Sequence, residues 1–95
     1  MIYPHEIKEE AELETLEAYL YYEEKQKGLG DSFLSQLEKY LNRICKNPLH
    51  FPLKNGYREA FIKKFPFLII YEFSGETIIV YSVFNTYQNP DKKPE

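Results

Sequence analysis

Three β-rich segments joined by two short turns constrain the fold of this chain more than any other feature. The segments cover residues 57–64, 67–73 and 76–84, and Phe65-Pro66 and Ser74-Gly75 separate them. Because connections this short join antiparallel neighbours, the segments predict a three-stranded antiparallel meander. The last two segments are apolar on both faces, which favours central positions in the sheet. One face would then pack against helices, and the C-terminal tail or another protein would cover the other.

The preceding half of the chain has the periodicity of two amphipathic helices. Apolar side chains recur at helical spacing from residue 8 to residue 26. They are Leu13, Leu16 and Leu20 in one stripe, with Ala11, Ala18 and Tyr22 beside it. A second helical pattern follows Gly28-Leu29-Gly30, with Asp31 or Ser32 as its expected cap, and it ends at Asn47-Pro48. The two patterns predict an antiparallel helical hairpin.

The remaining segments complete an α+β fold. Residues 2–7 have the composition of a short strand, which Pro4 restricts to a sheet edge or a strand start. Residues 47–56 contain two prolines and a glycine and are expected to form an irregular loop. The predicted order is therefore a short N-terminal strand, the helical hairpin and then the meander. A chain of 95 residues rarely divides its core, so we expect a single domain over residues 1–95.

Cysteine usage and hydropathy indicate a cytoplasmic protein. Cys45 is the only cysteine, which excludes an internal disulfide and favours a reducing compartment. Pro4, His5 and Glu6 lie where a signal peptide would need an apolar core. The longest apolar stretch, residues 65–71, is far shorter than a membrane-spanning helix. We therefore expect no membrane association.

The net charge of −3 conceals a division of charge along the chain. Residues 1–40 hold four Lys and Arg against ten Asp and Glu, whereas residues 41–95 hold eight against five. Within residues 43–64 the count is six against one, Glu59. A two-signed protein is unlike a general nucleic-acid binder, which is basic overall. The pattern does permit one basic face that meets an acidic partner or a phosphate backbone.

Few residues of this chain have the spacing of a metal-binding or catalytic motif. His5, His50 and Cys45 are too widely spaced for a metal-ligand motif, so we expect neither a metal nor a cofactor. The glutamates of residues 9–17 fit a solvated helix face better than a pair of catalytic carboxylates.

The basic segment is the strongest candidate for a functional surface. Metal-free cleavage of RNA needs a base, an acid and cations that stabilise the charge developing on the phosphate. The candidate cations are Arg58, Lys54, Lys63 and Lys64, and the candidate proton-transfer groups are Tyr87 and His50. In the alternative interpretation, Arg58 forms a salt bridge or packs along the sheet, and the lysines keep the sheet edge soluble. The residues themselves leave both interpretations open.

The order of motifs resembles the RelE/ParE toxin superfamily, particularly its ParE-like, plasmid-stabilisation branch. The motifs are Glu17-Ala18-Tyr19-Leu20-Tyr21-Tyr22-Glu23, Gly28-Leu29-Gly30-Asp31-Ser32-Phe33, Ile44 with Asn47-Pro48, Phe51-Pro52, Tyr57-Arg58, Lys64-Phe65-Pro66-Phe67-Leu68-Ile69-Ile70-Tyr71 and Val80 to Val83. Together they cover almost the whole chain in the order and spacing of the superfamily. The resemblance implies the same succession of a strand, two helices and three strands.

The resemblance also implies a function: the toxin of a bacterial type II toxin–antitoxin system, neutralised by a cognate antitoxin. The ParE branch acts on DNA gyrase, whereas the ribonuclease branch cleaves messenger RNA on the ribosome. This chain has Leu68 where the ribonuclease branch has an arginine, and residues 84–90 lack that branch's basic or histidine-containing cluster. We therefore expect a toxin that acts by binding, with gyrase as its target.

Arg58 matches a position of the superfamily clearly. With Lys63, Lys64 and Tyr87 it forms the surface where we expect the target or the antitoxin to bind. An antitoxin helix or strand would cross the sheet and the helical hairpin there. Two alternatives are a ribosome-dependent endoribonuclease that uses Arg58, Lys54 and Tyr87, and a detoxified relative that retains only protein binding. Neither an enzymatic activity nor the oligomeric state follows from the sequence.

Overall fold

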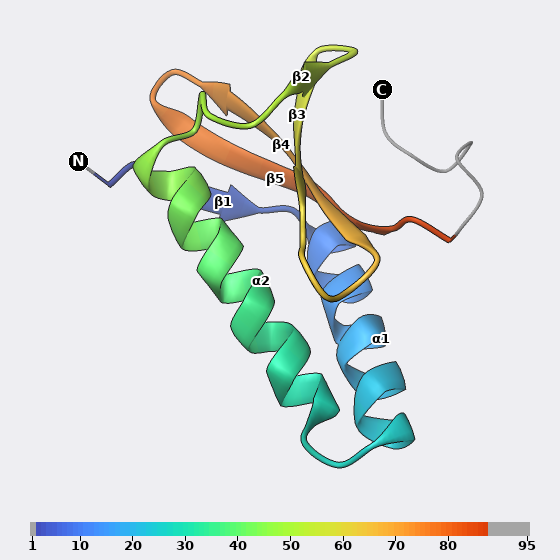
Figure 1. The fold of residues 1–95 in the computed structure, drawn as a ribbon. Helices are drawn as coiled ribbons and strands as arrows, with labels where there is room; N and C mark the ends of the chain where they lie inside the picture. Colours follow the sequence, from blue (N-terminus) through green and yellow to red (C-terminus); the bar gives the residue numbers. More distant parts are fainter. Residues whose placement is uncertain (1, 88–95) are drawn as a thin grey trace.

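The computed structural model describes residues 2–87, in which a helical hairpin packs against one face of a five-stranded sheet (Figure 1). The helices are α1 (Glu9–Lys25) and α2 (Leu29–Lys46). The strands are β1 (His5–Ile7), β2 (Leu53–Lys54), β3 (Tyr57–Phe61), β4 (Phe67–Ser74) and β5 (Thr77–Asn85). The predicted α+β order is confirmed, with β3, β4 and β5 as the antiparallel meander.

The sheet is mixed rather than purely antiparallel. Its strand order is β1-β5-β4-β3-β2, and β1 pairs in parallel with β5, so that His5 lies opposite Ile78. The parallel pairing arises because the whole helical hairpin separates β1 from the meander and carries the chain across the sheet. β1 therefore lies at an edge of the sheet, as predicted from the sequence, and its neighbour is β5, the last strand in the chain.

Two-residue turns with positive φ angles close two of the hairpins. Gly75 and Glu76, with φ of 56° and 65°, join β4 to β5. Asn55 and Gly56, with φ of 52° and 85°, join β2 to β3, although residues 47–56 were expected to be irregular. Asn-Gly is a strong signal for this type of tight turn, and the prediction of a loop alone was wrong here.

The core lies between the hairpin and the sheet and is rich in aromatic rings. Phe33 of α2 is fully buried, and its ring centroid lies 5.4 Å from that of Phe65 and 5.0 Å from that of Phe67. Tyr22 of α1 joins this cluster, at 4.9 Å from Phe65. Contacts between aromatic rings in edge-on and tilted geometries add to the energy of burial, so the cluster ties both helices to the β3–β4 turn and the start of β4.

Helix α1 turns its small residues, not its leucines, toward the core. Ala11 and Ala18 are buried, whereas Leu13, Leu16 and Leu20 keep 52%, 53% and 55% of their surface exposed. Small side chains allow the helix to approach the sheet closely, and larger residues contributed by α2 and the strands fill the core. Helical spacing showed that the leucines share a face but did not reveal which face is buried.

The two helices also meet closely at the turn of the hairpin. A Cβ atom on Gly30 would lie 2.7 Å from the backbone oxygen of Tyr19, so only glycine fits this position without a shift. Glu23 of α1 caps α2: its carboxylate accepts hydrogen bonds from the backbone N–H of Gly28 (2.9 Å) and Gly30 (3.0 Å). The predicted cap at Asp31 or Ser32 was wrong, because α2 begins earlier, at Leu29.

The face of the sheet away from the helices carries a second apolar layer. Ile70 and Phe84 are buried there, although they lie outside the core between the helices and the sheet. Tyr57 and Tyr81 pack edge to face beside them, with ring centroids 5.4 Å apart. The C-terminal tail that was predicted to cover this face falls in residues 88–95, outside the described part of the chain.

Across residues 2–87, neither helix combines the length and the apolar character that crossing a membrane would require.

Candidate functional site

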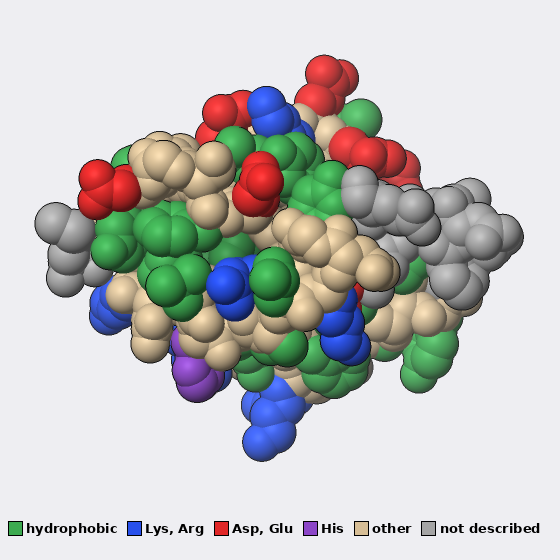
Figure 2. All heavy atoms as spheres, turned by 90° about the horizontal axis from the view of Figure 1, so that it is seen from above, with side chains coloured by type: hydrophobic (Ala, Val, Ile, Leu, Met, Phe, Trp, Pro, Cys, Tyr) green, Lys and Arg blue, Asp and Glu red, His purple; other side chains and the backbone are tan. Residues whose placement is uncertain are grey.

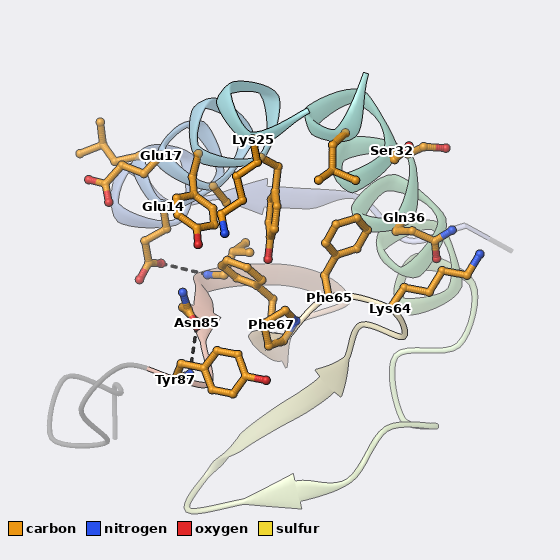
Figure 3. A pocket seen from close by; sticks show the side chains of 18 of the residues that line it. Glu14, Glu17, Lys25, Ser32, Gln36, Lys64, Phe65, Phe67, Asn85 and Tyr87 are labelled. Atoms are coloured by element: carbon orange, nitrogen blue, oxygen red, sulfur yellow. Dashed lines mark hydrogen bonds between the residues drawn. The ribbon is translucent and has the colours of Figure 1, made fainter. Parts of the chain in front are cut away.

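A groove of about 1210 Å³ runs between the helical hairpin and the end of the sheet where β5 finishes. Figure 3 shows Glu14 and Glu17 on the α1 side of the groove and Ser32 and Gln36 on the α2 side. Phe65 and Phe67 of the aromatic cluster lie between the two sides (Figure 3). The groove thus has an apolar floor and walls that mix polar and apolar side chains, an arrangement typical of sites that bind a chain segment or a small molecule.

Glu14 connects the α1 wall of the groove to the sheet. One of its carboxylate oxygens accepts hydrogen bonds from the hydroxyl of Ser82 (2.8 Å) and from the backbone N–H of Val83 (2.9 Å). Burial raises the pKa of Glu14, the two hydrogen bonds lower it, and the nearby charges of Glu10 and Glu17 raise it further. The expectation that the glutamates of residues 9–17 are all solvated was therefore wrong for Glu14, which positions β5 beneath α1.

Lysines and tyrosines form the rim of the groove. The ammonium group of Lys25 lies 4.8 Å from the ring centroid of Tyr21, within the range of a cation–π interaction. Lys64 adopts a positive φ of 82° in the turn between β3 and β4. Tyr87 is 86% exposed, and its backbone N–H donates to the side-chain oxygen of Asn85 (2.9 Å; Figure 3). The groove therefore places a positive charge and an exposed ring where a partner can reach them.

Arg58 lies away from the groove, and its side chain holds a loop in place. Its guanidinium group donates to the backbone oxygen of Phe51 (2.8 Å) and, at 3.4 Å, to that of Leu49. Beside it, the hydroxyl of Tyr71 donates to the backbone oxygen of Pro48 (2.6 Å). Burial raises the pKa of Tyr71 to about 12, although the charge of Arg58 lowers it. Arg58 and Tyr71 together fasten the segment between α2 and β2 to the sheet.

The candidate residues predicted from the sequence fall into two groups. Lys54 pairs with Tyr57 on the neighbouring strand, so it lies at the same end of the β2–β3 hairpin as Arg58. Lys63, Lys64 and Tyr87 lie at the other end, where Phe67 pairs with Asn85. Tyr71 lies opposite Arg58, four residue positions along β4 from Phe67, a distance of roughly 13 Å of strand. The structure therefore brings together Lys64 and Tyr87 but does not bring Tyr87 to Arg58 and Lys54.

His50 is part of the basic end of the molecule that contains Arg58. A small hollow of about 290 Å³ is lined by Arg43, Lys46, Asn47, His50 and Phe51. His50 packs edge to face on Phe51, with ring centroids 5.1 Å apart. On the face seen in Figure 2, most of the visible Asp and Glu side chains lie toward the upper edge, and most of the visible Lys and Arg side chains lie in the lower half.

Sequence reasoning identified the basic residues but missed most of the groove. Glu14 was hidden in a run of glutamates, and its partners Ser82 and Val83 come from the far end of the chain.

Near β1, the sulfur of Cys45 lies 3.6 Å from a ring nitrogen of His5, and burial raises the pKa of the thiol. Within residues 2–87, no three His, Cys, Asp or Glu side chains lie close enough together to hold a metal ion.

The family model described as "ParE toxin of type II toxin-antitoxin system, parDE" matches residues 6–90, which is nearly the whole chain. The chain belongs to the ParE toxin family. Its resemblance to ParE-like toxins, and hence to the toxins of type II toxin–antitoxin systems, is thereby confirmed.

A solved structure from P. aeruginosa, titled "Chromosomal ParDE TA system from P. aeruginosa", has a similar fold. The TM-score is 0.77 at 10% sequence identity, and the match covers 88% of this chain and 96% of the other. At this identity the similarity concerns the fold alone, and it places the strand, the helical hairpin and the meander in the ParE arrangement. No match was found among curated proteins.

Proposed function

We propose that this ParE-family protein is a toxin that acts by binding, with DNA gyrase as its target and a cognate antitoxin as its inhibitor. Membership of the ParE toxin family supports the general part of this proposal. The placement of the candidate residues supports binding, rather than RNA cleavage, as the mode of action. Acid–base cleavage of RNA needs its groups within hydrogen-bond reach of one scissile phosphate. Arg58 is instead directed at the backbone oxygen of Phe51, away from Tyr87.

The observation that carries the proposal is the groove between the helical hairpin and the end of β5. Its volume of about 1210 Å³ exceeds the ~300–1,000 Å³ of most small-molecule pockets, and its walls present both polar and apolar side chains. A groove of this size and character suits a segment of a protein chain. An antitoxin helix or strand that lies there would cover Tyr21, Lys64 and Tyr87.

The antitoxin would neutralise the toxin by occupying the surface that the target needs. Lys64 and Tyr87 are accessible to gyrase only while the groove is empty. Lys63, next to Lys64 in the same turn, extends this surface, and Arg58 supports the opposite end of the sheet rather than contacting the target.

A supercoiling assay with purified gyrase tests the proposal. The folded protein should inhibit supercoiling, and the double variant Lys64→Ala/Tyr87→Ala should inhibit at least about tenfold less well, because truncating a central contact commonly weakens binding by that factor. Lys54→Ala is the matched control at the other end of the sheet and should inhibit like the wild type. Supercoiling that continues in the presence of excess folded wild-type protein would contradict the choice of gyrase.

A translation reaction with a defined messenger RNA distinguishes the ribonuclease alternative. We expect the RNA to remain intact in the presence of the protein. Cleavage that is lost in both Arg58→Ala and Tyr87→Phe would instead favour an endoribonuclease that uses these residues. Absence of both cleavage and gyrase inhibition, with the antitoxin still bound, would favour a detoxified relative.

A further inference from the structure

Three leucines on the outer side of α1 form an exposed apolar line, here called the leucine seam (Leu13, Leu16 and Leu20). Each keeps more than half of its surface exposed, because Ala11 and Ala18 face the core in their place. Their spacing of three and then four residues puts them in one row along the helix. This is the a–d spacing of a coiled-coil seam, and contiguous exposed apolar surface of this kind marks an interaction site.

Glutamates border the leucine seam on both sides. Glu10, Glu17 and Glu24, here called the acidic row, recur at intervals of seven residues and therefore run parallel to the seam. Glu12 lies on the other flank, and all four side chains are exposed. The lysines at the two ends of α1 have other partners: Lys8 pairs with Glu6 at 2.8 Å and Lys25 packs on Tyr21. The seam is thus an apolar line between two negative margins.

We infer that the leucine seam docks a basic amphipathic helix of a partner protein. Leucines at a and d positions of the partner would pack between the seam leucines, and Lys or Arg at its e and g positions would pair with the acidic row. A second copy of this chain fits poorly, because the glutamates of the two copies would face one another. Charge complementarity therefore selects a different, cationic helix.

The seam adjoins the groove and shares a margin with it, but Leu16 and Leu20 do not line the groove. Leu13, Glu10 and Glu17 also line the groove, so the acidic row lies along the boundary between the two. From Glu10 to Glu24 the helix rises by about 21 Å, which accommodates two heptads of a partner. A helix on the seam would thus run along one margin of the groove. The inference does not depend on toxicity, because it concerns binding alone.

Binding of a synthetic three-heptad peptide tests the inference. The peptide carries Leu at a and d, Lys at e and g and a fluorescent label, and fluorescence anisotropy reports its binding to the full-length protein. We expect it to bind, while one control peptide with Glu at e and g and another with Ser at a and d do not. Leu16→Ser should weaken binding by about tenfold or more, because a buried anchor is lost. Leu34→Ser, at an exposed leucine of α2, is the matched control and should bind like the wild type.

A charge exchange makes the test specific to the acidic row. The triple variant Glu10→Lys/Glu17→Lys/Glu24→Lys should bind the peptide with Glu at e and g and should no longer bind the peptide with Lys at these positions. Equal binding of the Lys peptides with Leu or Ser at a and d would overturn the inference, since it would reflect net charge alone. Failure of the Leu/Lys peptide to bind would also overturn it. A dimer seen by sedimentation that Leu16→Ser dissociates would make a second copy the occupant instead.

Discussion

Removal of the Glu14 carboxylate should destabilise the fold, whereas its replacement by an amide should not. Glu14→Ala leaves the backbone N–H of Val83 and the hydroxyl of Ser82 without the acceptor that they share, and both residues are almost fully buried. A buried N–H without a partner costs about 1–3 kcal/mol, and a hydrogen-bonded hydroxyl contributes about 1 kcal/mol. We therefore expect Glu14→Ala to lower the free energy of unfolding by about 2–4 kcal/mol.

Glu14→Gln keeps a carbonyl oxygen with two lone pairs at the same position, so both hydrogen bonds can persist. Burial already favours the neutral form of this side chain, as its raised pKa indicates. The amide variant should accordingly lie within about 1 kcal/mol of the wild type. Urea unfolding at pH 7 measures the free energy of unfolding of both variants and of the wild type. Equal losses for Ala and Gln, or no loss for Ala, would refute the assignment of Glu14 as the acceptor that fixes β5.

The raised pKa of Glu14 also predicts how the stability of the fold changes with pH. Because the pKa of Glu14 is raised in the folded state, the folded protein binds more protons than the unfolded chain at and above the ordinary pKa of 4.5. The contribution of Glu14 to stability is therefore fully present below that pKa and is lost as pH rises through the folded value. The stability of the wild type relative to Glu14→Gln should fall from pH 4.5 upward and then level off. An increase over this range would contradict the direction of the shift.

Three further variants test the packing of the fold. Gly30→Ala should lower the free energy of unfolding in urea by about 1–3 kcal/mol, because its Cβ would lie 2.7 Å from the backbone oxygen of Tyr19. An unchanged free energy of unfolding would mean that the two helices can move apart without cost. Glu23→Ala should cost about 1 kcal/mol by removing the cap of α2, and amide exchange should quicken in its first turn. Arg58→Ala should cost about 1–3 kcal/mol and speed amide exchange around His50, whose loop it holds; unchanged exchange there would show that the contact is dispensable.

The order of elements could be predicted from the sequence because it depends on local signals. Alternation and short turns define the meander, and two helical patterns on either side of Gly28 define the hairpin. The parallel pairing of β1 could not be read locally, since His5 and Ile78 meet only in the folded chain. The second hairpin turn was available in the sequence: Asn55-Gly56 is a strong signal, and it was missed.

The faces of α1 and the details of the groove depended on tertiary structure. Spacing places Leu13, Leu16 and Leu20 on one face but does not say whether that face meets the sheet. Ala11 and Ala18 face the sheet and allow α1 to lie close to it, a tertiary contact that no local pattern encodes. The partners of Arg58 are backbone oxygens, which a list of side chains does not reveal. Local patterns thus predict the order of the elements, whereas the pairing of β1 and the details of the site depend on long-range contacts.

Growth of a bacterial culture after induction of this gene alone tests the central claim most directly. The account predicts arrest of growth, because a toxin of the ParE family is then present without its antitoxin. A frame-shifted copy of the gene is the control for the burden of expression. Undiminished growth of a host whose gyrase the purified protein binds, with the protein present in soluble and folded form, would contradict the account.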